Sequence, residues 1–450
     1  MVSAKRGFYV GLFTLALPIM AQSFINSLVN MVDTVMIGRL GTVEIAAVGL
    51  GNQIYFLLNM IFFGITSGGA VFTAQFWGKK DLAGIKRATG FCLALVVSIG
   101  LLFTLVCFIF PRWVIGLYSI DPAVIASGAQ YLRTVSLSFI PFGISFVFVI
   151  ILRSVERIRL SLYSTLISLS LNVVLNYLFI FGAGPIPALG VTGAALATLT
   201  SRFVELCIVL TVSYAKKYPP AGTLKEFFSF TTTFAARFSL IAVPVIVNEL
   251  LWGLGITLQS VIFARTNTDS IAAFNITNTI SNLTWVFYIG LANGASVMIG
   301  KKIGEGDHDT ARNYASRIVR FAPLTAPAVI AVLFLLRPLV PSFFNISPQA
   351  LAYLNSMFIF LALAYPFRAF NISMIIGVGR AGGDTRFTVL YDLFFMWFFA
   401  LPAAALAAFI FAAPVWLIYL LVMSEEMIKV VPGMLRLRSG KWLHDVTGEG

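Results

Sequence analysis

The chain has 450 residues, of which 59% are hydrophobic and 11% are charged, and its formal net charge is +13. An ordinary soluble domain is about 45–50% apolar and about 25% charged, so this composition excludes a water-soluble fold. A basic balance can indicate nucleic-acid binding, but here the Lys and Arg residues lie in short segments between long apolar stretches. We therefore predict an integral membrane protein that contacts the lipid bilayer and no nucleic acid.

The first apolar stretch decides between a signal peptide and a retained helix. Lys5 and Arg6 precede it, as basic residues precede the apolar core of a signal peptide, but no further charge follows until Asp33. Such a core has only about 7–15 residues. We therefore predict a retained first membrane span.

The stretches that follow are charge-poor and repeatedly long enough to cross a bilayer, which requires about 20 apolar helical residues. They predict twelve transmembrane helices, with eleven or thirteen as alternatives. The predicted spans are residues 8–34, 46–75, 90–111, 132–152, 160–182, 190–213, 238–262, 271–298, 318–336, 350–378, 387–411 and 413–434.

The distribution of Lys and Arg predicts the orientation, because these residues are enriched in short cytoplasmic loops. With the N-terminus inside, the even-numbered loops collect most of them, Arg153 and Arg380 included. The outer loops hold only Arg39, Arg112, Arg133, Arg265 and Arg337. The C-terminal segment adds Lys429, Arg436, Arg438 and Lys441 on the inner side. We predict a multi-pass protein of the cytoplasmic (inner) cell membrane with both termini in the cytoplasm.

An internal repeat divides the chain into halves. Residues 18–81 align without gaps on residues 244–307, 226 positions further on (244 − 18 = 226). The matched pairs include Pro18 with Pro244, Arg39 with Arg265, Asn52 with Asn278, Gly64 with Gly290, Gly68 with Gly294 and Asp81 with Asp307. Because six helices is an even number, both halves enter the membrane in the same direction. Parallel halves of this kind place a substrate path between them in known transporters.

The predicted fold is thus an all-α integral membrane protein with twelve transmembrane helices in two parallel, pseudo-symmetric six-helix lobes. The predicted divisions are an N-lobe at 1–215, a cytoplasmic linker at 216–233, a C-lobe at 234–436 and a cytoplasmic tail at 437–450. We expect a monomer.

Three groups of residues resemble one known family, the multidrug and toxic compound extrusion (MATE) transporters. They are Pro18 followed by Asp33-Thr-Val-Met-Ile-Gly38, the sequence Gly190-Val-Thr-Gly-Ala-Ala, and Gly379-Arg380 with Gly383-Asp384-Thr385. The resemblance covers nearly the whole chain. It implies a bacterial-type transporter with the MATE/MOP fold, which exports organic, often cationic and amphipathic compounds in exchange for Na⁺ or H⁺ by rocking of two lobes.

Ionisable residues inside a bilayer are costly and therefore suggest function. Asp33 lies in the first span, where a carboxylate can hold a cation or accept a proton. The resembled family uses an acid at this position. The alternative is a hydrated residue near the outer interface, six positions before Arg39. Asp33 aligns with Gln259 in the repeat, so only the first half carries this acid.

Two amides and a hydroxyl are the predicted companions of Asp33. Asn172 and Asn176 are four residues apart and share one face of a helix, and Thr198 lies in the next helix. Their oxygens could complete a Na⁺ site with Asp33, or they could simply form interhelical hydrogen bonds. Some members of the family carry an aspartate at the position of Asn176, so this site has one negative charge fewer.

The second half carries its own acid, Glu249, which resembles the acidic residue of a C-lobe cation site in the family. The usual aspartate partner is missing, because the corresponding stretch reads Arg368-Ala369-Phe370-Asn371. We hypothesise a buried ion pair between Glu249 and Arg368.

Other polar residues are weaker predictions. Arg202 with Glu205 is interpreted as a local pair near the inner boundary, and Glu425 with Glu426 as residues of the inner surface. Asp392 is assigned either to function or to interface hydration or helix capping near the cytoplasmic end. The weaker predicted lining of a substrate cavity is Trp252, Gln259, Asn275, Asn278, Arg368 and Asp392.

The leading functional prediction is a secondary active antiporter without any cofactor besides its coupling ion. No GxxxxGK[ST] motif is present, and Cys92, Cys107, Cys207, His308 and His444 form no metal-binding or nucleophilic cluster, so we predict no enzyme. A lipid-linked oligosaccharide flippase is the alternative, but its pyrophosphate would require several buried cations, and the sequence offers essentially two. A channel also remains open.

Overall fold

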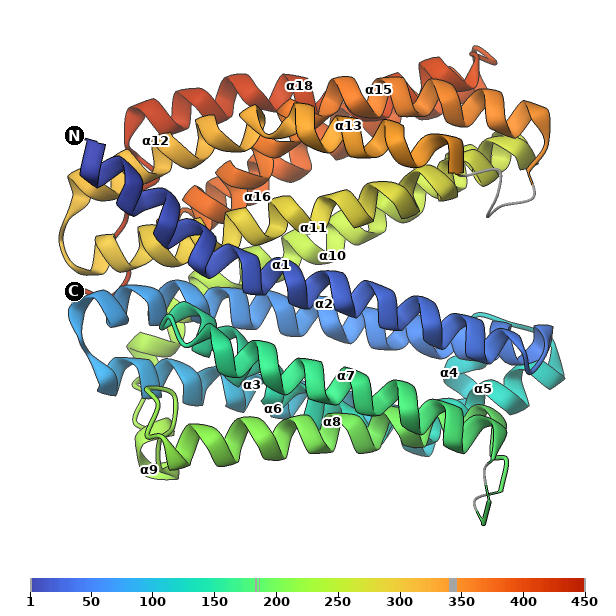
Figure 1. Cartoon of the computed structure of the whole chain (residues 1–450), viewed down its shortest axis with the longest axis horizontal. Helices are drawn as coiled ribbons and strands as arrows, with labels where there is room; N and C mark the ends of the chain where they lie inside the picture. The colour runs from blue at the N-terminus through green and yellow to red at the C-terminus, as the bar shows by residue number, and fades with distance from the viewer. Residues whose placement is uncertain (1, 183, 186, 340–345, 449–450) are drawn as a thin grey trace. The chain divides into compact units, whose positions relative to one another are not determined.

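The computed structural model describes residues 2–182, 184–185, 187–339 and 346–448, and within these ranges the regular elements are helical. Figure 1 shows their arrangement. The first half contains α1 (Val2–Gly38), α2 (Thr42–Lys79), α3 (Leu82–Ile109), α4 (Pro111–Gly116), α5 (Pro122–Val135), α6 (Phe139–Ser154), α7 (Ile158–Phe181) and α8 (Gly190–Ala215). The linker contains α9 (Leu224–Phe227). The second half contains α10 (Thr232–Thr266), α11 (Thr268–Gly304), α12 (His308–Leu324), α13 (Ala326–Leu336), α15 (Pro348–Ile372), α16 (Thr385–Phe395), α17 (Leu401–Phe409) and α18 (Val415–Ser439).

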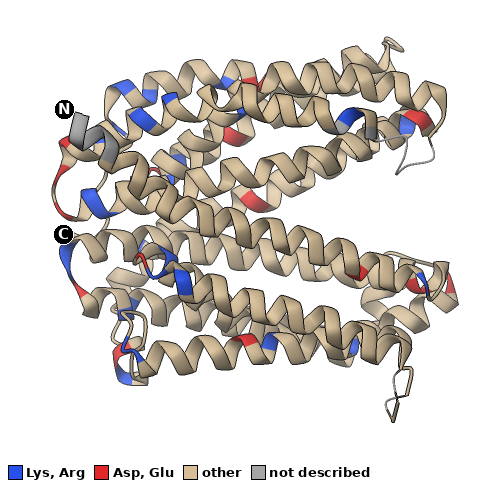
Figure 2. Cartoon of the chain, in the orientation of Figure 1, with Lys and Arg blue, Asp and Glu red and all other residues tan. Residues whose placement is uncertain are grey.

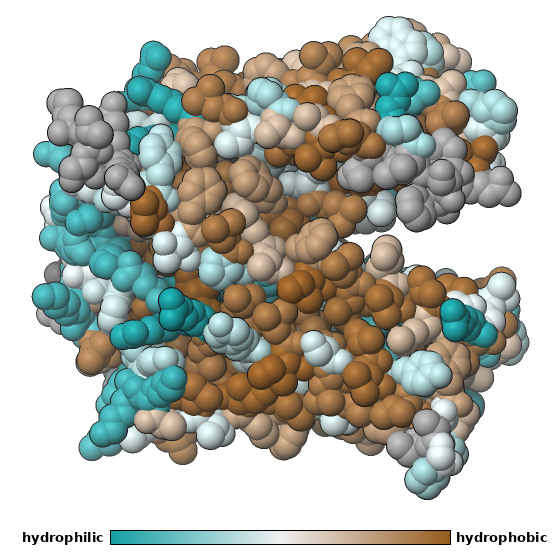
Figure 3. Space-filling model, viewed as in Figure 1, coloured by the Kyte–Doolittle hydropathy of each residue, from teal (hydrophilic) through white to brown (hydrophobic). Residues whose placement is uncertain are grey.

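The predicted all-α membrane fold is confirmed, with eleven or twelve membrane helices among the described residues. Eleven helical segments of the described chain are long and apolar enough to cross a bilayer, and α18 is the twelfth. That last helix carries Glu425, Glu426 and Lys429 in its middle, so it is the most charged of the set. Apolar side chains cover the middles of the helices, and polar ones gather at their ends (Figure 3).

Several spans are composite. The predicted span 132–152 begins ten residues earlier, because α5 continues through a short 3-10 segment into α6. Two π-helical segments, η3 (Ser373–Arg380) and η4 (Met396–Ala400), continue α15 and α16. Single π turns inside helices change which residues face the same side, and they are frequent at functional sites.

The repeat explains how the helices begin and meet. Asp81 accepts a hydrogen bond from Gly84 N at 2.8 Å at the start of α3, and its partner Asp307 accepts one from Thr310 N at 3.1 Å at the start of α12. Both carboxylates therefore cap the third helix of their half, which satisfies an otherwise unpaired N–H group. The repeated Asp is thus a structural residue.

The described chain groups into two compact units, one of residues 21–246 and one of residues 1–20 with 247–450. This grouping differs from the predicted lobes at two places. Residues 1–20 belong to the unit of the second half, and residues 234–246 to that of the first. Parts of the predicted lobes and tail, namely residues 1, 183, 186, 340–345 and 449–450, lie outside the described residues.

Repeated glycines account for this exchange of helix ends. In α2, a Cβ on Gly64 would lie 2.7 Å from Cα of Ile246, and one on Gly68 would lie 2.8 Å from Cβ of Ala242 in α10. Their repeat partners in α11 likewise approach the first part of α1 closely. A Cβ on Gly290 would lie 3.1 Å from the Ala16 carbonyl oxygen, and one on Gly294 would lie 3.3 Å from Cβ of Ala16. Pairs of small residues four apart allow helix backbones to approach closely in membranes.

We expect Gly64→Leu to destabilise the protein by about 1–3 kcal/mol, because the larger side chain cannot enter this contact without moving α10. The measurement is the thermal unfolding of the purified protein in detergent. Gly49→Leu in the same helix is the matched control, because a Cβ there meets nothing within 4 Å. Equal unfolding temperatures for the two variants would contradict the close-packing account.

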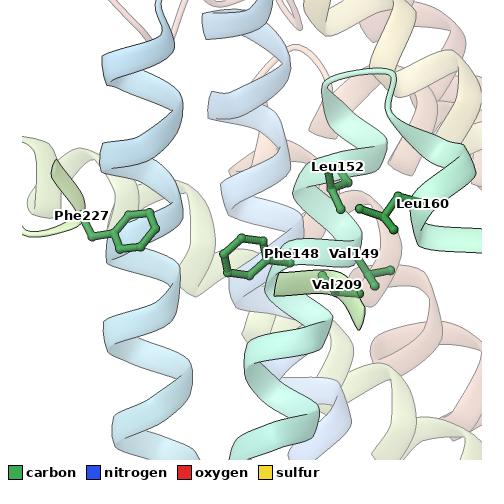
Figure 4. Close-up of a cluster of buried hydrophobic side chains, with 6 residues drawn as sticks. All are labelled: Phe148, Val149, Leu152, Leu160, Val209 and Phe227. Carbon is green, nitrogen blue, oxygen red and sulfur yellow. The ribbon is translucent and has the colours of Figure 1, made fainter. Parts of the chain in front are cut away.

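The linker is anchored to the first unit. Phe227 of α9 belongs to a buried cluster with Phe148, Val149, Leu152, Leu160 and Val209, which come from α6, α7 and α8 (Figure 4). Glu226 accepts a hydrogen bond from Lys86 of α3 at 2.7 Å and also closes a capping box with Thr223. The predicted solvated loop therefore contains a short helix that packs on the membrane helices.

The hydrogen bond from Lys86 and the capping contact with Thr223 lower the pKa of Glu226 from 4.5 to about 2. Because the pKa is lowered on folding, the contribution of this carboxylate is complete above pH 4.5 and is lost only as the pH falls through about 2. We expect the rate of tryptic cleavage at Lys225 to change little between about pH 6 and 8 beyond the change in trypsin activity, and Glu226→Gln to raise it at both. An unchanged rate in that variant would show that the contact does not hold α9.

The tail also packs on the protein. Trp442 is 1% exposed, and the backbone N–H of His444 donates to the Gly382 carbonyl oxygen at 2.9 Å. Arg436 makes two bonds of 2.7 and 2.8 Å to the Asp384 carboxylate. Residues up to His444 thus cover the turn between η3 and α16.

Candidate functional site

A polar cavity of about 400 Å³ lies within the unit of residues 21–246, and Asp33 forms part of its wall. Helices α1, α2, α5, α7 and α8 all contribute to it, and α7 and α8 lie side by side (Figure 1). Its polar lining consists of Asn30, Asp33, Thr34, Asn52, Tyr55, Asn59, Tyr131, Ser168, Asn172, Asn176, Thr198, Ser201 and Arg202. A single carboxylate therefore faces a wall of amides and hydroxyls, to which Arg202 adds one guanidinium group.

Asp33 is joined directly to the two predicted amides. Its Oδ1 accepts a hydrogen bond from Nδ2 of Asn176 at 2.7 Å, and the same nitrogen donates to Oδ1 of Asn172 at 3.2 Å. Asn172 is 7% and Asn176 2% exposed, so both amides are buried. One turn of α7 separates them, which directs both toward α1.

The cavity offers further acceptors to a cation or proton. Oδ1 of Asn176 is buried and has no hydrogen-bond partner among the described residues. Thr198 lines the same cavity from α8, and its hydroxyl donates to the Ala194 carbonyl oxygen at 3.1 Å, which leaves its own oxygen able to accept. The structure therefore brings Asp33, Asn172, Asn176 and Thr198 to one place.

Sequence reasoning missed the wall supplied by α2 and α5. The hydroxyl of Tyr131 donates to Oδ1 of Asn52 at 3.0 Å, and Tyr55 and Asn59 follow on the same side of α2. Asn52 and Asn59 are seven residues apart, two helical turns, so they lie on one face. This spacing and the recurrence of Asn52 at Asn278 were the signals that could have found them.

A second cavity of about 270 Å³ shares Asn30, Tyr55, Asn59 and Arg202 with the first. Because these residues line both, the polar lining continues along α1 and α2 away from Asp33. The second cavity adds Gln22, Asn26, Arg153, Thr165 and Glu205.

Arg202 and Glu205 form the predicted pair, with Nη1 and Oε2 2.9 Å apart. Glu205 is buried and Arg202 is half-buried, and the pair belongs to a network of hydrogen bonds that the sequence did not reveal. Thr165 donates to Glu205 at 2.8 Å, and Gln22 donates to Thr165 at 2.5 Å. Arg153 then donates to Gln22 at 2.5 Å, so this residue is a half-buried member of the network at the end of α6, and its assignment to a loop was wrong.

Glu249 is paired, but the predicted partner was wrong. Its Oε1 lies 2.6 Å from Nη2 of Arg380, and the side chains are 17% and 5% exposed. Arg368 instead lies 3.4 Å from Glu426 and donates to Ser281 at 3.0 Å. The π-helical segment η3 separates the two arginines and changes the face on which Arg380 lies.

Asp392 is 8% exposed, which corrects the interpretation as a hydrated residue. Its carboxylate accepts hydrogen bonds from Asn248 and Lys429, both at 3.1 Å. Lys429 and Glu425 are buried as well, at 2% and 5% exposure, so neither lies in a tail or at an inner surface. Mutual pairing explains how charged groups can be buried here.

The other weakly predicted cavity residues are spread along α10 and α11. Gln259 is buried and Trp252 is half-buried in α10, whereas Asn278 is half-buried and Asn275 exposed in α11. Arg368 and Asp392 each pair with a charged residue of α18, Arg368 with Glu426 and Asp392 with Lys429.

No set of three or more His, Cys, Asp or Glu side chains is placed to hold a metal ion in the part of the chain that the structure describes. A cation at Asp33 would therefore be held by one carboxylate and by neutral oxygens. Such a donor set suits a singly charged hard ion better than a transition metal.

A family profile described as MatE matches residues 18–178 and 244–402, which are corresponding segments of the two halves. The chain belongs to the MATE family. This membership confirms the predicted family and fold class, and it identifies a multi-pass membrane transporter. The twofold match also reproduces the internal repeat.

Relatives in bacteria agree with this assignment. The uncharacterized transporter YisQ of Bacillus subtilis is 25% identical over 442 residues, covering 96% of this chain and 94% of its own. The multidrug resistance protein PmpM of Pseudomonas aeruginosa is 26% identical over 400 residues, covering 87% and 82%. The matched regions therefore span most of the length of both relatives.

Solved structures show the same fold. A crystal structure of MATE in complex with MaL6 superposes with a TM-score of 0.87 at 19% identity, covering 96% of both chains. An outward-facing conformation of a multidrug resistance MATE family transporter of the MOP superfamily superposes with a TM-score of 0.86 at 20% identity, again over 96% of both.

Proposed function

We propose that this MATE protein exports small organic compounds, often cationic and amphipathic, in exchange for Na⁺ or H⁺ moving inward. The observation that supports this most directly is the single carboxylate of Asp33 in a cavity of amides and hydroxyls. A carboxylate of this kind can bind a cation or a proton reversibly. The presence of multidrug resistance proteins among the relatives supports the proposal of organic substrates for this chain.

Ion binding at Asp33 changes the contact between α1 and α7. A proton on Asp33 replaces an ionic acceptor by a neutral one, which weakens its hydrogen bond with Asn176. Na⁺ requires a different change, because the Asn176 amide must turn its unpartnered Oδ1 toward the ion. Either ion can drive export only if it and the organic compound favour different states or compete for one state.

Glu249 takes part in coupling through its ion pair with Arg380. Because both side chains are largely buried, the pair favours the packing of α10 on η3 that the structure shows. A change in that packing would release the pair and bias the inward-open and outward-open states. We further propose that Arg368 and Asp392 contribute polar side chains to the substrate path of the second half.

The protein is proposed to act as a monomer in the cytoplasmic membrane with both termini inside. Within residues 21–246, Lys and Arg gather at the turns α2–α3 and α8–α9 (Figure 2). Within the other unit, they gather at the turn α11–α12 and the end of α18 (Figure 2). Short loops rich in Lys and Arg are typical of the cytoplasmic side.

A flippase for a pyrophosphate-linked lipid is less well supported. Among the described residues, the basic side chains Arg380 and Lys429 are buried, and Arg153, Arg202 and Arg368 are half-buried. Each of them already binds a carboxylate or polar side chain. A pyrophosphate would have to displace those partners.

The test is efflux of a fluorescent organic cation from membrane vesicles with an imposed ion gradient. We expect a Na⁺ or a pH gradient to accelerate efflux by at least about tenfold over the rate without a gradient. Vesicles lacking the protein are the control. Efflux that ignores both gradients would contradict the proposed coupling.

A further inference from the structure

A buried cluster of charged side chains joins α10, α15, α16 and α18 in the unit that contains residues 247–450. At its centre, Nζ of Lys429 lies 3.1 Å from Oδ1 of Asp392 and 3.2 Å from Oε2 of Glu425. The three side chains are 3%, 11% and 7% exposed, in that order. One ammonium group therefore serves two carboxylates.

The remaining charges of the cluster form a separate pair. Glu426 lies 3.4 Å from Nε of Arg368 and accepts a hydrogen bond from Asn371 at 2.7 Å. Tyr391 donates to the other end of that amide at 2.5 Å. Glu426 is thus satisfied by α15 and α16 and leaves Lys429 to Asp392 and Glu425.

Counting charges shows an excess of one acid. Two basic side chains, Arg368 and Lys429, face three acidic ones, Asp392, Glu425 and Glu426, so the cluster has a net charge of −1 when all are ionised. The α17 and η4 segments, which also pack on α18, bring no titratable side chain. Burying an uncompensated charge costs several kcal/mol, and such a group usually takes up a proton or binds an ion.

Two buried acceptors at the cluster lack a hydrogen-bond partner among the described residues, although one of them lies 3.2 Å from the Lys429 ammonium. Oδ1 of Asn248 is one, and this residue is 4% exposed and donates through its Nδ2 to Asp392 at 3.1 Å. Oε2 of Glu425 is the other, since it lies near Lys429 without accepting a hydrogen bond. Unpartnered acceptors beside an excess carboxylate call for a donor, which a carboxyl proton supplies.

The first half contains a related network of hydrogen-bonded side chains whose net charge has the opposite sign. Gln22 and Asn248 occupy the same repeat position (248 − 22 = 226), and each donates to the fifth helix of its half, at Thr165 and at Asp392. The sixth helix then supplies Glu205 in one half and Lys429 in the other. Among the described residues, acidic side chains outnumber basic ones in the second-half network, whereas Arg153 and Arg202 outnumber Glu205 in the first.

We infer that Asp392 and Glu425 share one exchangeable proton around Lys429, which makes this cluster a second proton site in the transporter. A proton fits better than Na⁺, because it neutralises one carboxylate and leaves an ordinary Lys–carboxylate pair, whereas Na⁺ would lie beside the Lys429 ammonium. Its role in transport rests on the proposed antiport, but the binding of the proton does not.

Infrared spectroscopy of the full chain in lipid membranes tests the inference through the stretching band of a protonated carboxyl group. We expect such a band near neutral pH in the wild type. Because the excess is a single charge, Glu425→Gln or Asp392→Asn alone should remove it. Lys429→Gln raises the excess to two, so the band should persist and grow about twofold.

All variants are compared in an Asp33→Asn background, because Asp33 is itself proposed to take up a proton and would give a carboxyl band of its own. The band of the cluster should persist in Asp33→Asn alone, since that acid lies in the other unit. Circular dichroism shows whether each variant is folded. Glu425→Gln and Asp392→Asn test the inference independently, so either one suffices if the other does not fold. A band that survives in both Glu425→Gln and Asp392→Asn would overturn the inference. A band that Na⁺ abolishes at constant pH would overturn it in favour of a cation site.

Transport separates this inference from the proposed function. In proteoliposomes, the pH gradient that just balances a known substrate gradient gives the number of protons exchanged per substrate. We expect Glu425→Gln to exchange one proton fewer than the wild type, and an equal number would overturn the role in transport. A wild type that ignores pH gradients would contradict proton antiport, while the infrared band would still decide whether the site exists.

Discussion

Replacing Asp33 with asparagine is expected to lower ion-gradient-driven efflux by at least about tenfold, which corresponds to about 1.4 kcal/mol of lost driving interaction. Asparagine keeps the size of the side chain and can still hydrogen-bond to Asn176, but it cannot be protonated or hold a cation by charge. Folding and substrate binding should therefore persist while coupling is lost. Efflux from vesicles with an imposed gradient measures the effect.

Asp121→Asn is the matched control for this prediction. That aspartate caps α5 at an exposed position, where its carboxylate accepts a hydrogen bond from Ala123 N at 2.8 Å. Removing its charge should leave gradient-driven efflux within about twofold of the wild type, because exposed substitutions have small effects. Wild-type coupling in well-folded Asp33→Asn protein would show that the ion binds elsewhere.

Arg380→Gln is expected to destabilise the protein by about 3–5 kcal/mol, because it leaves the largely buried Glu249 carboxylate without its ionic partner. Arg380 is 4% exposed, so water cannot easily replace the lost contact. The loss should appear as a lower unfolding temperature in detergent and as reduced amounts of protein in the membrane.

Arg386→Gln provides the control, since Arg386 is exposed only six residues further along. It should change the unfolding temperature little. Combining Arg380→Gln with Glu249→Gln should recover part of the stability, because the stranded charge is removed along with its partner. If the double variant is no more stable than Arg380→Gln, the ion pair is not the source of the effect.

The repeat made most of the fold predictable. Matching prolines, glycines and aspartates gave two parallel halves, and the structure gives several of these residues a physical role, as close-packing glycines in α2 and α11 and as caps at Asp81 and Asp307. The exchange of helix ends between the compact units was not predictable, because the repeat records equivalent positions and not contacts between elements.

The candidate site in the first half of the protein was predictable for a different reason. Asp33 is a lone acid in a long apolar run, and Asn172 with Asn176 shows a helical spacing that local sequence reveals. The cluster around Lys429 was not predicted, because Glu425, Glu426 and Lys429 lie close together in the sequence and resemble a segment at the membrane interface. Only packing shows that Asp392 and Asn248 surround them and make their burial possible.

Glu249 illustrates the limit most clearly. Its partner was sought at Arg368, because the family places an acid near that position, whereas the structure pairs it with Arg380 twelve residues later (380 − 368 = 12). The intervening segment is π-helical, so a regular helical period does not predict which side chains point toward α10.

The most direct test of the account is the ion movement that the organic compound itself causes. In proteoliposomes without any imposed ion gradient, an inward gradient of a transported organic cation should drive H⁺ or Na⁺ outward, as recorded by an ion-sensitive dye. Asp33→Asn should lower that flux by at least about tenfold. Reciprocity requires this result, because an ion that drives the compound must also be driven by it. Transport of the compound with no opposing ion flux would contradict the proposed antiport.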